Sequence, residues 1–119
     1  MDRPVTGLVS RLLALVALIS ALPGGVSAHN LIVFASVDCT SVVVEAKFSS
    51  GRVAQQGAVR VLDGENILLV ETTLSEDGTV SVPLAGLDHS TGLVIEVDTG
   101  GHDNYWILTP EDIARKCGS

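Results

Sequence analysis

The stretch TSVVVEAKF, residues 40–48, carries the clearest structural signal in this 119-residue chain. Apolar side chains occupy every second position from Val42 to Phe48, while Glu45 and Lys47 fall on the opposite face. A period of two is typical of a β-strand with one buried and one solvated face. The stretch therefore predicts a β-strand that is buried on one face and exposed on the other.

Six further segments on both sides of this stretch have the same character, with glycine-rich turns between them. Including residues 40–48, the expected strands are residues 31–37, 40–48, 58–62, 65–73, 79–84, 92–99 and 102–109. Asp63-Gly64 predicts a tight turn. Residues 110–116 predict a short helical turn with Thr109 as its N-cap. Short strands at this spacing are typical of an antiparallel immunoglobulin-like or transthyretin-like β-sandwich, so we expect an all-β domain of about seven strands.

Residues 1–28 have the order of features found in a cleavable secretory signal peptide, and we expect them to form a signal-peptide helix. Two arginines come first, an apolar run that contains one polar residue, Ser20, covers residues 12–22, and small residues precede the expected cleavage after Ala28. The apolar run is too short for a membrane span, which needs about 20 residues. We therefore expect cleavage, export, and a mature β-sandwich domain of residues 29–119 without a membrane span.

The mature chain would be strongly acidic. Asp2, Arg3 and Arg11 leave with the signal peptide, so 13 acidic and 5 basic side chains remain, a net charge of −8. Nucleic acids and anionic membrane surfaces attract basic patches, so this balance argues against both as partners. No serine-nucleophile motif, zinc-protease helix motif or phosphate-binding glycine loop occurs, and we expect the protein not to be an enzyme.

Cys39 and Cys117 are the only cysteines. Disulfides persist in exported proteins, so we expect a Cys39–Cys117 bridge that closes nearly the whole domain into one loop. Two separate thiols or a metal-binding pair remain the alternatives, although an isolated pair at this spacing has no zinc signature.

The histidines are the candidate metal ligands. Cleavage after Ala28 would make His29 the N-terminal residue, whose amine and imidazole both offer lone pairs near neutral pH. Together these two nitrogens can chelate one ion, and such ligands suit nickel, copper and zinc. The alternative is that a histidine follows the cleavage site by chance.

A second histidine can join the first if the topology is favourable. If the first strand pairs in parallel with the last, His29 and His102 lie at the same end, with Asp103 or Asp98 as an oxygen ligand. His89 would then lie in a surface loop at the opposite end. The expected metal site is therefore His29, His102 and Asp103.

The motifs around these histidines resemble one known family. Residues 29–35, directly after Ala28, are similar to the A-H-x-(L/V)-x-V-F-A start of periplasmic accessory proteins of energy-coupling-factor nickel/cobalt transporters. Residues 101–106 are similar to the G-H-x-x-x-(W/Y) ending of that family. Weaker similarity covers residues 42–51, residues 57–63 and the acidic turn at residues 76–78, so the resemblance spans essentially the whole mature chain.

The resemblance implies a sandwich related to carboxypeptidase regulatory-like and transthyretin-like domains. It also implies a periplasmic role in nickel or cobalt uptake beside a membrane permease, with the ion bound transiently. Many relatives continue into a C-terminal membrane helix, whereas this sequence ends at Ser119. We therefore expect a protein that is free in the periplasm or held there by its transporter.

Two other classes of function stay open. One is a metal-free interaction module, in which Tyr105 or Trp106, on opposite faces of the last expected strand, would contact a partner while the other packs in the core. The other is a copper-binding periplasmic protein. The only methionine is Met1, which argues against Cu(I) handling but not against Cu(II).

Overall fold

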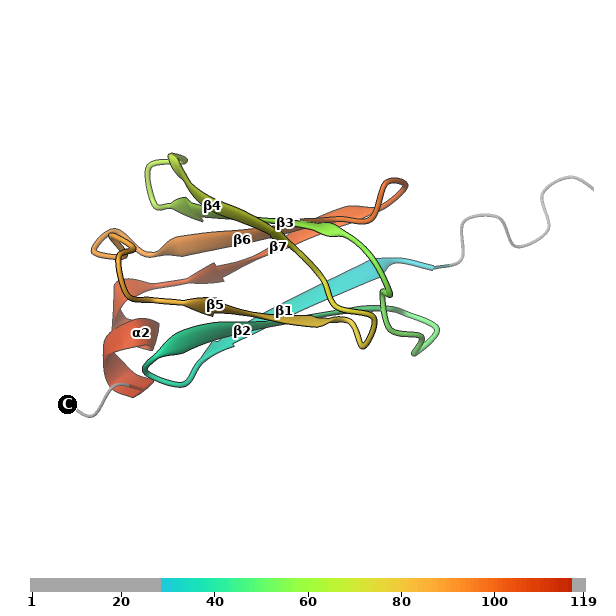
Figure 1. Ribbon diagram of the computed structural model, residues 1–119, viewed down its shortest axis with the longest axis horizontal. Helices are drawn as coiled ribbons and strands as arrows, with labels where there is room; N and C mark the ends of the chain where they lie inside the picture. Colours follow the sequence, from blue (N-terminus) through green and yellow to red (C-terminus); the bar gives the residue numbers. More distant parts are fainter. Residues whose placement is uncertain (1–28, 117–119) are drawn as a thin grey trace, which may run out of the picture.

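The computed structural model describes residues 29–116, which form a sandwich of two antiparallel sheets with one short helix (Figure 1). The strands are β1 Leu31–Val37, β2 Ser41–Phe48, β3 Ala58–Asp63, β4 Leu68–Thr73, β5 Thr79–Pro83, β6 Leu93–Asp98 and β7 Asp103–Leu108, and the helix is α2 Pro110–Lys116. The predicted all-β sandwich is confirmed. The predicted signal-peptide helix and cleavage site, and Cys117, lie outside the described residues.

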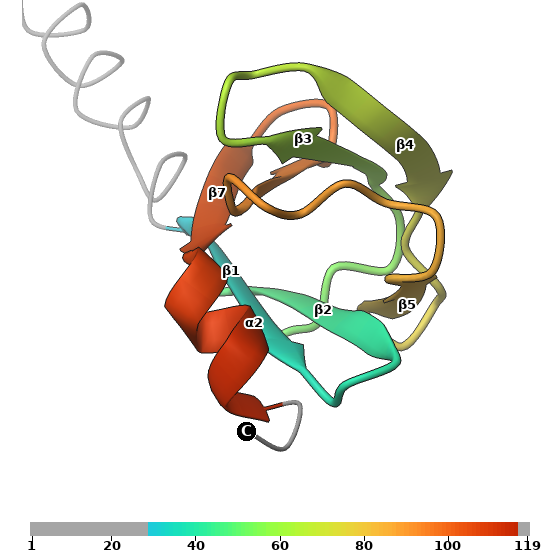
Figure 2. The same ribbon diagram turned by 90° about the vertical axis from the view of Figure 1, so that its left-hand side faces the viewer.

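The two sheets contain strands from all parts of the chain. One sheet has the order β1-β2-β5, and the other has the order β4-β3-β6-β7. Figure 2 shows the sheets facing each other, with β1 and β7 meeting along one side and α2 at one end. Within residues 29–116 no helix is long and apolar enough to cross a membrane.

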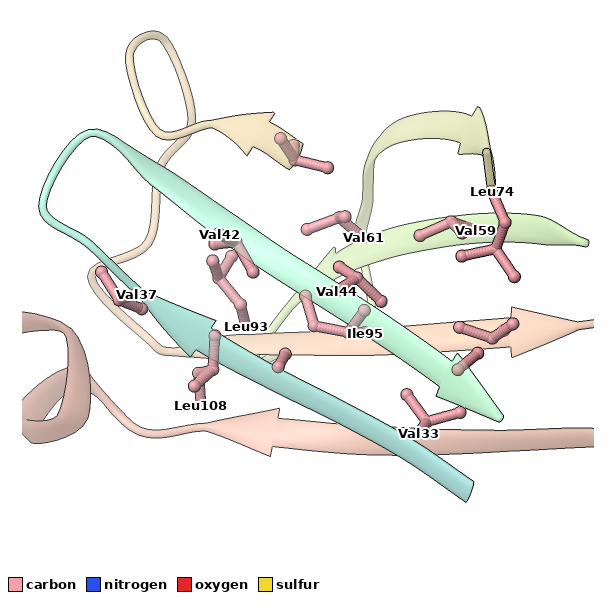
Figure 3. Close-up of a cluster of buried hydrophobic side chains, with 14 of the residues drawn as sticks. Val33, Val37, Val42, Val44, Val59, Val61, Leu74, Leu93, Ile95 and Leu108 are labelled. Carbon is pink, nitrogen blue, oxygen red and sulfur yellow. The ribbon is translucent and has the colours of Figure 1, made fainter. Parts of the chain in front are cut away.

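The core lies between the sheets and consists of the side chains at every second strand position. Val42 and Val44, from the stretch that predicts the fold most clearly, are fully buried. They lie opposite Ile95 and Val61 of the four-stranded sheet (Figure 3). Among the described residues no polar or charged side chain is buried, so the interior is held by apolar packing alone.

β4 begins three residues later than the sequence pattern predicts. The Asp63 carboxylate accepts hydrogen bonds from the backbone N–H groups of Glu65 and Ile67, at 2.8 and 3.0 Å. Asn66 adopts a positive φ of 67°, a conformation that asparagine tolerates. The predicted turn at Asp63-Gly64 therefore extends to Asn66, and the strand cannot start before it ends.

Helix α2 has the bounds and the N-cap that the sequence predicts. The Thr109 hydroxyl accepts a hydrogen bond from the backbone N–H of Asp112 at 3.1 Å. The Asp112 carboxylate accepts one in return from the Thr109 N–H at 3.0 Å, which completes a capping box. Ile113 is buried against the core and anchors the helix to the sandwich.

The predicted parallel pairing of the first strand with the last is wrong. β1 pairs with β2, because a tight connection joins these two strands. β7 pairs with β6 in the other sheet. β1 and β7 nevertheless lie side by side with their starts at the same end. The Asn104 amide donates to the Leu31 carbonyl at 2.9 Å, and the rings of Phe34 and Trp106 meet edge to face, with centroids 5.0 Å apart.

Candidate functional site

His29 precedes β1 at the end of the sandwich opposite α2 (Figure 1). The next residue, Asn30, is held by two hydrogen bonds to Ser49, which directly follows β2. The Asn30 N–H donates to the Ser49 hydroxyl at 3.0 Å, and the Ser49 N–H donates to the Asn30 carbonyl at 2.8 Å. The backbone beside His29 is thereby fixed against the end of β2.

His102 reaches the same region from the other sheet. It closes the β6–β7 connection, where its carbonyl accepts hydrogen bonds from the N–H and hydroxyl of Thr99 at 2.8 and 3.1 Å. Its ring packs edge to face on Phe48, with centroids 5.6 Å apart. Phe48 and Ser49 are consecutive, so one short segment contacts His102 and fixes the residue after His29. We call the region formed by His29, Phe48, Ser49 and His102 the histidine end.

A hollow of about 670 Å³ lies beside the His102 ring. Its polar lining comes from loops that are distant in sequence: Arg52, Gln55, Gln56, Glu76 and Thr99. The sequence pattern assigns Glu76 only to an acidic turn, and no spacing signal connects it with His102. The β4–β5 loop brings the two residues to one hollow, which therefore offers an imidazole and a carboxylate.

Asp103 does not share that hollow. It lies across the ladder from Asp98 and lines a separate hollow of about 290 Å³ with Arg60 and Glu96. Among residues 29–116 no group of three or more His, Cys, Asp or Glu side chains is arranged to hold a metal ion. The structure thus places His29 and His102 at one end of the sandwich and directs Asp103 elsewhere.

His89 lies at the other end of the sandwich, as the sequence predicts. It lines a hollow with Cys39, Pro110 and Ile113, beside helix α2. The Cys39 thiol donates a hydrogen bond to the carbonyl of Lys116, the residue before Cys117. The predicted Cys39–Cys117 disulfide remains a prediction, because Cys117 lies outside the described residues.

The Asp38 side chain fixes the turn between β1 and β2 that contains Cys39. The backbone N–H groups of Ser41 and Thr40 donate to the Asp38 carboxylate, at 2.8 and 3.1 Å. These bonds, with one from the Thr40 hydroxyl, hold the pKa of Asp38 below its usual value. Cys39 itself has a positive φ of 83°, which the surrounding turn maintains.

The outside of the four-stranded sheet is a second candidate site, and we call it the outer four-strand face. It combines exposed apolar side chains with carboxylates: Leu68, Tyr105, Ile107, Glu71, Glu96, Asp98 and Asp103. Tyr105 points outward and is 57% exposed. Trp106 lies on the opposite side of β7, packs against the ring of Phe34 on β1 and is 38% exposed, so neither aromatic side chain is in the core.

Comparison of the chain with family models, with curated proteins and with solved structures finds no match. The histidine end and the outer four-strand face are therefore the features from which a function can be argued. The first offers nitrogen ligands, and the second offers an apolar and acidic surface.

Proposed function

We propose that the mature domain is an exported periplasmic accessory protein of a nickel or cobalt uptake system. It binds the ion at the histidine end and passes it to a membrane permease or regulates that permease. The observation that supports this proposal is that His29 and His102, which are 73 positions apart in the sequence, lie at the same end of the sandwich. Phe48 contacts the His102 ring, and Ser49 holds the residue beside His29.

The ligand chemistry is that of an incomplete, exposed site. After cleavage, the His29 amine and imidazole supply two nitrogens to one ion, and the His102 imidazole supplies a third. Nitrogen ligands of this kind suit nickel, cobalt and copper. A small ligand set near solvent leaves coordination positions open, which suits an ion that is cargo and must be released.

Nickel titration by calorimetry tests the site with three forms of the protein. The first begins at His29, the second carries one alanine before His29, and the third carries His102→Phe, which keeps a ring against Phe48. We expect the second and third forms to bind nickel about tenfold more weakly or worse, because the added alanine moves the free amine away from His29 and His102→Phe removes an imidazole. His89→Phe, at the opposite end of the sandwich, is the matched control and should leave the affinity unchanged.

Equal nickel affinity in all forms would contradict the proposed site. Cobalt and copper titrations of the same forms would show which ion the site prefers. Because copper outcompetes nickel at most nitrogen sites, the absorption spectra of the complexes and not their affinities alone should be compared.

A metal-free interaction module is the second candidate function. It is favoured by the exposed apolar side chains of the outer four-strand face, since contiguous apolar patches on a small domain often mark interaction sites. Co-purification with a permease that chelators do not disturb, together with no nickel binding in the titration, would favour this function over the first.

A further inference from the structure

The outer four-strand face has an ordered cross-strand arrangement. One row runs from Leu68 through Leu62 and Val94 to Ile107. The neighbouring row runs across the same strands from Glu71 through Arg60 and Glu96 to Tyr105. Side chains in such rows point to the same face of a sheet, so an apolar row lies directly beside a charged one.

The apolar row ends in side chains that the fold leaves open to solvent. Ile107 is 55% exposed and Leu68 is 40% exposed, and Ile67 in the adjoining turn is 56% exposed. Tyr105 lies next to Ile107 on the same face. Tyrosine is enriched in protein interfaces because its ring buries area while its hydroxyl can remain hydrogen-bonded.

The charged side chains on this face are mostly acidic. Glu71, Glu96, Asp98 and Asp103 face a single cation, Arg60, which forms an exposed ion pair with Glu96 at 3.4 Å. The face therefore carries about three net negative charges within a chain whose mature form is strongly acidic.

The charge decides which occupant fits. A second copy of the chain would bring the same acidic face, or another part of an acidic molecule, against this one, which is unfavourable. An extended protein segment that alternates basic and apolar side chains fits both rows. Its cations would meet the carboxylates, and its apolar side chains would cover Ile107 and Tyr105.

We infer that the outer four-strand face is a docking surface for a lysine- or arginine-bearing segment of a partner protein. The inference does not depend on metal binding, because the face is separate from the histidine end. Apolar contacts to Ile107, Tyr105 and Leu68 supply affinity, while the carboxylates supply specificity and speed of association.

The test is an amide NMR titration of nitrogen-15-labelled mature domain with a short synthetic peptide of alternating lysine and leucine. A peptide with glutamate in place of lysine is the charge control. We expect the lysine peptide to shift resonances of β6 and β7, with binding that weakens as salt is added, and the glutamate peptide to shift none.

Matched variants locate the contact. Ile107→Ser should weaken binding about tenfold, whereas Ile32→Ser, an isoleucine 43% exposed on the three-stranded sheet, should not change it. Glu71→Gln should weaken binding about threefold, whereas Glu45→Gln on the outside of β2 should not. Thermal unfolding of each variant checks that it is folded.

Four results would overturn the inference. They are no binding of the lysine peptide, equal binding of the glutamate peptide, shifts confined to β1 and β2, and concentration-dependent shifts without peptide, which would mean that a second copy occupies the face. None of these results bears on nickel affinity, so the proposed function can stand or fall separately.

Discussion

Gly64 lies where the β3–β4 turn meets the loop before β6, and the two backbones approach closely there. Its N–H donates to the Thr91 hydroxyl at 3.0 Å. A Cβ built on Gly64 would collide with the Thr91 carbonyl group, although the φ of Gly64 is not in the left-handed region. Glycine is required at this position because there is no room for a Cβ, and not because of the backbone conformation.

Gly64→Ala should therefore destabilise the domain by roughly 1–3 kcal/mol, because a loop backbone must move to admit the methyl group. Gly101→Ala is the matched control, since a Cβ at Gly101 meets no atom within 4 Å and its φ is ordinary. Urea unfolding of both variants measures the difference. Equal unfolding free energies would show that the Thr91 loop moves at no cost.

The sequence predicts the positions of some residues of the candidate site but not of others. His29 and His102 are prominent in the sequence because one follows a cleavage motif and the other a glycine pair, and the structure places both at one end. The sequence also offers Asp103 or Asp98 nearby as an oxygen ligand. Successive residues entering a strand point to opposite sides, so adjacency in sequence directs Asp103 to the outer four-strand face.

At the scale of elements, local pattern predicts strands well where one face is buried. β1 has the predicted bounds because its buried and exposed positions alternate from Leu31 to Val37. β4 is the exception, since Asp63 holds the preceding turn through hydrogen bonds that a hydrophobic pattern does not reveal. The predicted pairing of β1 with β7 is wrong, because pairings between strands distant in sequence depend on the whole fold.

The N-cap of α2 makes a pH-dependent contribution to stability. Hydrogen bonds from the Thr109 N–H and hydroxyl hold the pKa of Asp112 below its usual value of 3.8. A carboxyl group whose pKa is lower in the folded state stabilises that state at pH values above the pKa it has in the unfolded state. The contribution is lost as the pH falls through the lower, folded-state pKa.

We therefore expect Asp112→Asn to be less stable than the parent chain at neutral pH. The difference in unfolding free energy between the two proteins should shrink as the pH is lowered below about 3.8. Chemical unfolding at a series of pH values measures it. Thr109→Ala, which removes the other half of the capping box, should cost about 1 kcal/mol at neutral pH. A gap between Asp112→Asn and the parent that stays constant with pH would rule out the proposed linkage.

At the scale of the whole molecule, Asn104 links the two sheets. Its amide donates to the Leu31 carbonyl of β1, and its side-chain oxygen accepts a hydrogen bond from the Tyr105 N–H of β7 at 2.9 Å. One side chain thus hydrogen-bonds to backbone groups of the edge strands of both sheets.

Asn104→Ala should lower the unfolding free energy by about 1–2 kcal/mol, because it leaves two backbone groups without these partners. Asn104→Asp is the informative companion, since a carboxylate cannot donate to the Leu31 carbonyl and should be at least as destabilising. Hydrogen exchange at Tyr105 should accelerate in the alanine variant. Unchanged stability and exchange would show that water replaces the side chain fully.

The predicted Cys39–Cys117 disulfide would also act on the whole molecule. A bridge over so long a loop stabilises the fold by roughly 4–5 kcal/mol in the chain-entropy model, so reductant should lower the midpoint of thermal unfolding. Cys39→Ser should abolish the effect of reductant. Mass spectrometry of alkylated protein counts the thiols, and two alkylated cysteines in unreduced protein would contradict the bridge.

The contact between β1 and β7 has a consequence for aggregation. An unpaired strand edge is a template on which a foreign strand can add, and repeated addition leads to fibrils. Here each edge obstructs access to the other, and β5, an edge strand on the far side, ends in Pro83, which has no N–H to offer. The arrangement that brings the starts of the first and last strands together thus also keeps the edges of β1 and β7 from pairing with neighbouring chains.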